Sequence, residues 1–170
     1  MQLLKAMRLL SSRRLPEVNV LIRVQREDFD MGLELAKLTK DNHKVGGLTS
    51  FVGLVRDIAA PETISSMTLE HYPGMTEKQL EHIESIANQR WNLEASLIIH
   101  RFGKLNLGDQ IVLVACASAH RGEAFEACHF LIDWLKTKAP FWKLEETASG
   151  SKWVEAIDAD KDAAHRWSHK

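Results

Sequence analysis

The sequence predicts an α+β fold, because segments with strand and helix periodicity alternate along the chain without forming a regular strand–helix–strand repeat. Alternation of apolar and polar residues indicates strands, and apolar residues at helical spacing indicate helices. Some neighbouring strands are joined by connections too short for a parallel crossover, so at least two strand pairs should be antiparallel. The 170 residues are about the length of one domain, and we expect one folding unit.

The first half of the chain should contain three strands and two helices. Strands are expected over 18–24, 45–57 and 64–72. The first helix follows the first strand, with Asp28 or Asp30 able to cap its start. The second strand contains Gly46, Gly47 and Gly53, which suit a bent strand or a close approach of another backbone. After a loop over 58–63, the third strand should pair antiparallel with the second, since the connection is short.

A second helix should begin within 73–78 and be closed by Trp91. The apolar stripe that we expect it to bury consists of Met75, Leu80, Ile83, Ile86 and Ala87. Strands over 96–102 and 110–118 should then pair with each other, joined by a turn over 103–109.

The last third of the chain should contain one helix and two strands. The helix is expected over about 122–137, and Pro140 ends it. Its predicted buried residues are Phe125, Cys128, Leu131, Ile132 and Leu135. Two strands follow, over 141–146 and 152–156, with a turn around Ser149 and Gly150.

Composition excludes several classes of protein. The 22 basic and 23 acidic side chains leave a net charge of −1, which argues against a general nucleic-acid binder. No apolar stretch approaches the roughly 20 residues of a membrane-spanning helix. Cys116 and Cys128 lack metal-ligand spacing, as do the histidines, so we expect two buried thiols in a reducing compartment, no metal and no cofactor. The protein is therefore expected in the cytoplasm.

The two ends of the chain differ from the middle in composition. Residues 1–17 are rich in basic side chains and are expected to form a disordered or partly helical extension, and residues 158–170 a charged tail. The domain itself is expected over 18–157.

Cationic side chains in the last third are the strongest candidates for chemistry. Lys136 and Lys143 lie seven residues apart on either side of Pro140, so a chain reversal there would bring both ammonium groups to one pocket. Two neighbouring cations lower a lysine pKa toward the range of a base or nucleophile, or bind a phosphate while both are charged. The alternative, a solvated surface for both lysines, stays open.

His120 and Arg121 lie where a strand gives way to a helix, a place that favours anions because of the helix dipole and free N–H groups. Arg56 ends the second strand and is a third cationic candidate, with an ion pair to Asp57 or Glu62 as its alternative. A purely structural role also stays open for the His–Arg pair.

Other residues give weaker signals. His71 lies at a strand end and is expected to have a packing role rather than to contact a ligand. His100 and Arg101 should point to opposite faces of a strand, which argues against a joint site. Trp134, Trp142 and Trp153 are expected in the core or an interface.

Four motifs resemble the large catalytic subunits of molybdopterin synthase. They are Leu69–Thr76, Ser118–Arg121 with Ala124 and Phe125, Lys136–Glu145, and Gly150–Glu155. They occur in the family's order and spacing between about residues 18 and 156. The resemblance implies an α/β hammerhead fold with an additional antiparallel β subdomain.

The resemblance also implies a sulfur transferase that converts cyclic pyranopterin monophosphate into molybdopterin by installing a dithiolene. The sulfur donor would be a thiocarboxylate on the C-terminal Gly-Gly of a small ubiquitin-like partner, and two large subunits would form the centre of a heterotetramer. The catalytic residues would be Lys136 and Lys143. The substrate-binding residues would be Leu54, Val55, Arg56, His120, Arg121, Lys136, Lys143, Leu144 and Glu145.

Two rival functions are a non-catalytic module that docks a ubiquitin-like partner and, more remotely, a nucleic-acid binder. An adaptor would not require both lysines, so the presence of Lys136 and Lys143 beside a His–Arg pair favours the enzyme.

Overall fold

The computed structural model describes residues 18–57, 64–154, 166 and 167. The elements are β1 (Asn19–Gln25), α2 (Met31–Thr39), β2 (Gly47–Leu54), β3 (Ile64–His71), α3 (Met75–Arg90), β4 (Leu93–Arg101), β5 (Gly103–Asn106), β6 (Gln110–Ser118), α4 (Arg121–Thr137), β7 (Phe141–Thr147) and β8 (Gly150–Val154). The predicted α+β class is confirmed. The predicted loop over 58–63 and the extension over 1–17 lie outside the described residues, as does most of the charged tail.

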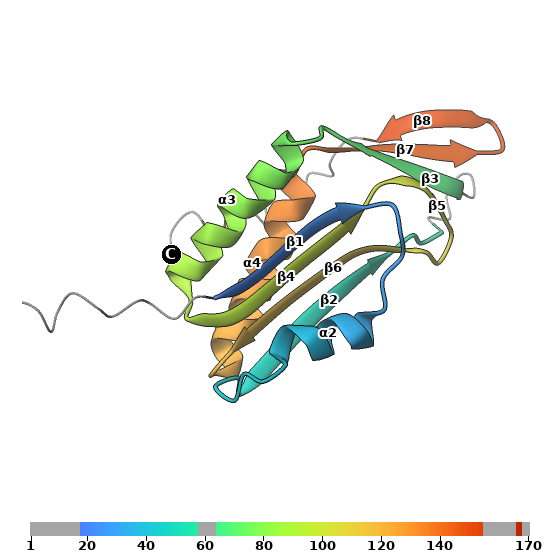
Figure 1. Ribbon diagram of the computed structural model, residues 1–170. Coiled ribbons are helices and arrows are strands. Elements are labelled where there is room, and N and C mark those ends of the chain that lie inside the picture. The colour runs from blue at the N-terminus through green and yellow to red at the C-terminus, as the bar shows by residue number, and fades with distance from the viewer. Residues whose placement is uncertain (1–17, 58–63, 155–165, 168–170) are drawn as a thin grey trace, which may run out of the picture.

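The strands form two sheets of four strands each (Figure 1). Sheet A has the order β1-β4-β6-β2, with β1 parallel to β4 and the other neighbours antiparallel. Sheet B has the order β5-β3-β7-β8 and is antiparallel throughout. Sheet A carries the helices, and sheet B lies beside one end of it, so the two sheets meet at a junction near the end of α4 (Figure 1).

Sheet A is covered by helices on both faces. Alternate residues of β4 show this directly: Ile98 packs into the core beneath α3 and α4, whereas Leu97 and Ile99 pack into the core beneath α2. These three side chains are fully buried, which explains why the middle of β4 is apolar at three consecutive positions instead of alternating.

Local signals account for the helix boundaries. Asp30 caps α2, because its carboxylate accepts a hydrogen bond from the Leu33 N–H at 2.9 Å. Helix α4 ends at Thr137, where the N–H of Lys138 donates to the Trp134 carbonyl at 2.8 Å. The proline at 140 then prevents the helix from continuing.

The glycines before and within β2 allow a close approach of the start of α4. A Cβ atom on Gly46 would lie 2.3 Å from the Ala119 carbonyl oxygen, and one on Gly47 would lie 3.2 Å from the Arg121 Cα. Close backbone approach, one of the two predicted reasons for these glycines, is therefore confirmed.

The predicted pairing of the second and third strands was wrong. β2 pairs with β6 in sheet A, whereas β3 pairs with β5 and β7 in sheet B. A short connection excludes a parallel crossover within one sheet, but it does not prevent the chain from passing from one sheet to another. The predicted turn over 103–109 was also too long, because its first part forms β5 on the edge of sheet B.

Two predicted core residues are exposed. Phe125 on α4 is 62% exposed and Met75, the first residue of α3, is 50% exposed. The other predicted α4 core residues and both cysteines are buried. Trp167, within the predicted tail, packs in the core with α3 and α4 and donates its indole N–H to Asp133 at 2.8 Å.

No helix within the described residues is both long enough and apolar enough to cross a membrane.

Replacing Leu131 by alanine should lower the free energy of unfolding by about 2–5 kcal/mol, because this fully buried α4 side chain would leave a cavity. The matched change Leu33→Ala removes the same atoms from a side chain that is 59% exposed and should cost no more than about 0.5 kcal/mol. Urea denaturation at a fixed protein concentration measures both. Equal losses would contradict the described core.

Candidate functional site

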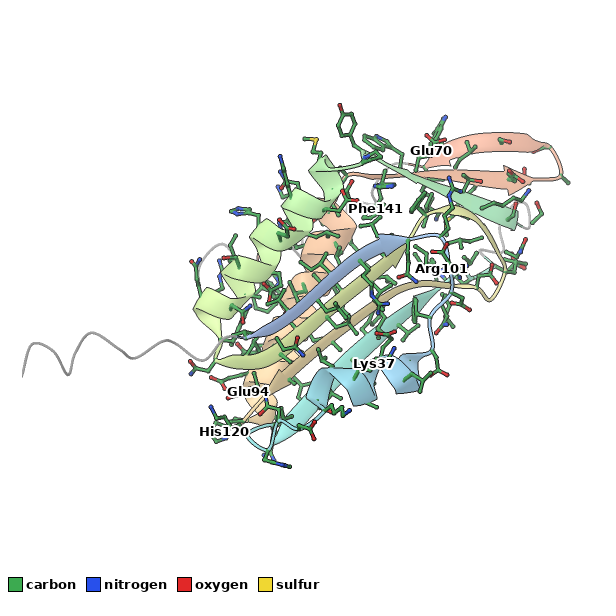
Figure 2. All side chains as sticks on the ribbon, in the orientation of Figure 1. Lys37, Glu70, Glu94, Arg101, His120 and Phe141 are labelled. Atoms are coloured by element: carbon green, nitrogen blue, oxygen red, sulfur yellow. The ribbon has the colours of Figure 1, made fainter. Side chains whose placement is uncertain are left out.

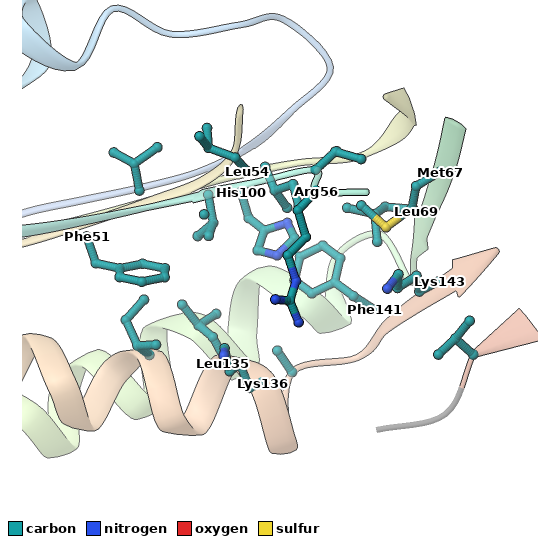
Figure 3. Close-up of a pocket in the computed structure, with 18 of the residues that line it drawn as sticks. Phe51, Leu54, Arg56, Met67, Leu69, His100, Leu135, Lys136, Phe141 and Lys143 are labelled. Atoms are coloured by element: carbon teal, nitrogen blue, oxygen red, sulfur yellow. The ribbon is translucent and has the colours of Figure 1, made fainter. Parts of the chain in front are cut away.

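A cavity of about 790 Å³ opens at the junction of the two sheets, beside the last turn of α4 (Figure 3). Its walls come from the end of β2, the inner faces of β3 and β7, and α4. Most of the lining is apolar. The lining residues with polar side chains are Arg56, His100, Lys136, Lys143 and Glu145. Such an apolar cavity with a few convergent polar groups is typical of a small-molecule site.

The chain reversal after α4 places Lys136 and Lys143 at the same cavity, as the position of the proline predicts. β7 pairs with β3 so that Lys143 lies opposite Leu69, a buried residue of the inner face. Lys143 therefore projects inward from sheet B, while Lys136 reaches the cavity from the last turn of α4. Lys136 is exposed at the mouth, and the Lys143 side chain retains 32% of its exposure.

Glu145 accompanies Lys143 on the inner face of β7 and forms an ion pair with it. Two residues apart on a strand, the two side chains point to the same side. Leu144 lies between them and points to the outer face, where it is paired with Thr68 and Trp153. Glu145 thus lines the cavity, and the side chain of Leu144 does not.

Leu54, Val55 and Arg56 form the wall at the end of β2. The backbone of Val55 is held on both sides, because its N–H donates to Asp109 at 2.9 Å and its carbonyl accepts from Gly108 at 2.8 Å. This anchoring fixes the point from which the Arg56 side chain extends into the cavity (Figure 3). Arg56 forms no ion pair with any described residue, including Asp57; Glu62 lies outside them.

His120 and Arg121 do not line this cavity. Both are exposed at the start of α4, whereas Lys136 lies in its last turn, about 22 Å away at 1.5 Å per residue. Figure 2 shows His120 and Phe141, the residue that follows the reversal, near opposite ends of α4. The four side chains that the resemblance assigns to one substrate site therefore do not meet within one chain, because a straight helix separates the His–Arg pair from the lysines.

The start of α4 already holds one anionic side chain. Glu123 accepts a hydrogen bond from Ser118 at 2.7 Å, and this bond lowers the pKa of Glu123. The same serine hydroxyl accepts from the His120 N–H at 3.3 Å.

His100 is the cavity residue whose role the sequence did not indicate. Its ring is 8% exposed and stacks on Phe141, with the ring centroids 3.7 Å apart and an angle of 15° between the planes. Arg101 points the other way and bonds to Asp28 and Gln110, so the predicted opposite orientation of the pair is confirmed. The position of His100 within a strand did not indicate that a second sheet packs over this part of the strand.

Burial, with a smaller contribution from the nearby His71, lowers the pKa of His100 to about 4, although the hydrogen bond to the Arg101 carbonyl opposes the shift. The cavity also contains Arg56, Lys136 and Lys143, with Glu145 as its single carboxylate. His100 is therefore neutral near pH 7.

A second hollow, of about 540 Å³, lies along the outer side of α4 against β2. It shares Phe51, Ile132 and Lys136 with the cavity, so the two hollows are neighbours. Within the described residues, no cluster of three or more histidine, cysteine, aspartate or glutamate side chains is suited to hold a metal ion.

Comparisons with known proteins agree on one family. The family model described as MoaE protein matches residues 24–138. A molybdopterin synthase catalytic subunit from Ralstonia nicotianae is 56% identical over 146 residues, which cover 86% of this chain and 83% of that protein.

Solved structures give the same result. The molybdopterin biosynthesis MoaE protein from Burkholderia ambifaria has a TM-score of 0.76 and 48% identity, covering 89% of this chain and 99% of that one. A molybdopterin synthase from Staphylococcus aureus has a TM-score of 0.72 and 30% identity, covering 78% of this chain and 95% of that one.

The neutral His100 should make the protein sensitive to acid. Its folded-state pKa of about 4 lies below the ordinary 6.5, so the unfolded chain binds a proton first as the pH falls. The stabilisation present above pH 6.5 is lost between pH 6.5 and 4, and the difference in pKa corresponds to about 3 kcal/mol. Between pH 7 and 4, the free energy of unfolding of His100→Gln should therefore fall by about 3 kcal/mol less than that of the unmodified protein. Urea denaturation at each pH measures this free energy.

The exposed His43 provides the control for this experiment. His43→Gln should keep the pH dependence of the unmodified protein. Parallel curves for His100→Gln and the unmodified protein would show that His100 is not buried in its neutral form.

Proposed function

Because this chain belongs to the MoaE family, we propose that it is the catalytic subunit of a molybdopterin synthase. The enzyme converts cyclic pyranopterin monophosphate into molybdopterin by forming a dithiolene. The observation that carries the proposal is the convergence of Arg56, Lys136 and Lys143 on one largely apolar cavity. Three cations in a chain whose net charge is −1 make a local positive site for anionic reactants.

The chemistry needs such a site because both reactants carry negative charge. The pterin brings a phosphate and the sulfur donor brings a thiocarboxylate. Cations positioned around an apolar cavity hold the two anions side by side. The transfer of sulfur from the thiocarboxylate to the pterin then becomes effectively unimolecular. In a partly water-excluded cavity the same charges also stabilise the negative charge that develops during the transfer.

Lys143 and Lys136 take different roles in this proposal. Lys143 projects from β7 beside Glu145 and acts on the acyl intermediate that the donor forms. Lys136 at the mouth supplies a base or electrostatic stabilisation. Leu54, Val55 and Glu145 shape the binding site around these groups, and Leu144 contributes through its backbone, because its side chain faces outward.

The sulfur donor in this proposal is a small ubiquitin-like subunit with a thiocarboxylated C-terminal Gly-Gly. The protein's own cysteines do not compete for this role, because Cys116 and Cys128 are both buried in the core.

His120 and Arg121 enter the proposal through a second copy of the chain. They lie too far from Lys136 along α4 to serve the same cavity. In a two-fold dimer, however, the start of one α4 can face the cavity of the other subunit, since such an interface places the same elements opposite each other twice. The His–Arg pair of one subunit then binds the substrate phosphate in the other, within a heterotetramer of two large and two small subunits.

Two further parts of the proposal concern fold and location. We assign the α/β hammerhead to sheet A with its helices, and the additional antiparallel subdomain to sheet B. Two free buried thiols support a reducing compartment, so the reaction is placed in the cytoplasm.

Lys136→Ala and Lys143→Ala should each lower the rate of dithiolene formation at least about 100-fold, because each removes a charge next to the reacting atoms. The assay uses the thiocarboxylated small subunit and the cyclic pterin. Lys138→Ala is the matched control: this exposed residue lies two positions from Lys136 but does not line the cavity. Its rate should stay within about threefold of the unmodified protein, since water and salt screen its charge.

Lys143→Arg separates charge from reactivity. The guanidinium keeps the positive charge beside Glu145 but stays protonated, so it cannot act as a nucleophile or base. The variant should bind the pterin normally and lose turnover as severely as Lys143→Ala. Full activity in Lys143→Arg would restrict Lys143 to an electrostatic role, and full activity in both alanine variants would contradict a catalytic role for either lysine.

Mixing two impaired variants, at a pterin concentration too low for Arg121→Ala to bind it, tests whether a second copy of the chain completes the site. Arg121→Ala should weaken substrate binding, and Lys143→Ala should abolish turnover. When equal amounts are unfolded and refolded together, about one site in four would contain both intact residues if they come from different subunits. The mixture should therefore recover about a quarter of the activity, compared with mock-treated unmodified protein. No recovery, with mixed dimers confirmed by mass spectrometry, would mean that the two residues do not share a site across subunits.

A further inference from the structure

The polar groups of the cavity are unevenly divided between hydrogen-bond donors and acceptors. Arg56, Lys136 and Lys143 are donors only, and the one carboxylate of the lining, Glu145, is engaged by Lys143. A ligand with phosphate and carbonyl oxygens finds many donors here. A ligand that must also donate an N–H finds few side-chain acceptors, and His100 is the uncharged one.

The backbone determines which nitrogen of His100 carries the proton. Nδ1 lies 2.9 Å from the carbonyl oxygen of Arg101. A carbonyl oxygen only accepts hydrogen bonds, so Nδ1 must be the donor. Because the ring is neutral, Nε2 then carries a lone pair and is an acceptor.

Nothing in the described part of the chain occupies that lone pair. The hydrogen bonds of His100 to described residues consist of the single bond from Nδ1, and the residue lines the cavity. Figure 3 shows the ring between the end of β2, which carries Arg56, and Phe141. The stack on Phe141 holds the ring plane, so the direction of the lone pair is fixed before a ligand arrives.

We propose that Nε2 of His100 is the acceptor that positions the pterin in this cavity, by receiving a ring or amino N–H of the substrate. The inference rests on the proposed function, which supplies a pterin as the ligand. Pterins carry N–H donors on the ring and the amino group, while the cations bind the phosphate. His100 thus distinguishes the pterin from other small phosphates, which the cations alone would also attract.

The first test observes the tautomer in the unmodified full-length protein. With ¹⁵N-labelled histidine, His100 should show a protonated Nδ1 and an unprotonated Nε2, and addition of the cyclic pterin should shift the Nε2 resonance. His100→Gln identifies the resonance by its absence. A protonated Nε2, or an Nε2 resonance that does not move when the pterin binds, would overturn the proposal.

The second test compares two replacements by calorimetric titration. His100→Phe keeps a ring to stack on Phe141 but removes the acceptor, and should weaken pterin binding about five- to tenfold. His100→Gln retains an acceptor oxygen at similar reach and should recover most of the affinity. Inorganic phosphate, titrated by ³¹P NMR, should bind all three proteins equally, because only the cations bind it.

The outcomes separate this proposal from the proposed function. If the unmodified protein binds the pterin and His100→Phe binds it equally well, His100 is not the acceptor and the proposed function stands. Equal weakening of pterin and phosphate in His100→Phe would indicate a collapsed cavity and also overturn the role of His100. If the unmodified protein binds no pterin, the proposed function is wrong and the inference falls with it.

Discussion

The stacked rings of His100 and Phe141 join the two sheets at the point where the cavity opens. His100 belongs to β4 in sheet A, and Phe141 is the first residue of β7 in sheet B. Because Phe141 comes directly after Pro140, this contact also determines where the chain goes after α4. The inward direction of Lys143, two residues later on the same strand, follows from it. A packing interaction between two apolar ring faces thus sets the position of a charged group.

The cavity illustrates how burial and charge act together in this protein. The apolar walls contributed by β2, β3 and α4 keep water away from one side of the cations, which makes their field stronger than it would be on an open surface. The same burial keeps His100 neutral. The same cavity therefore holds both positively charged side chains and an uncharged hydrogen-bond acceptor.

Much of the fold could be predicted from local patterns, since the period of apolar residues, the cap at Asp30 and the break at Pro140 are properties of neighbouring residues. The pairing of the strands could not be predicted this way. Whether β2 pairs with β3 or with β6 depends on contacts between residues far apart in sequence, and the length of one loop did not decide it.

The candidate site, like the fold, could be predicted only where neighbouring residues determine it. The convergence of Lys136 and Lys143 followed from a proline between them. His100 was missed because only the second sheet, packed over the end of β4, makes it part of a cavity. His120 and Arg121 were grouped with the lysines because sequence motifs give the type of a site residue without its distance. The length of α4 supplied that distance.

Helix α4 is 17 residues long and carries chemically distinct groups at its two ends. Each inserted or deleted residue would rotate everything beyond it by about 100° and move it by about 1.5 Å. Lys136 would leave the cavity mouth, although the Arg121 end stayed in place. The number of residues in the helix is therefore constrained during divergence.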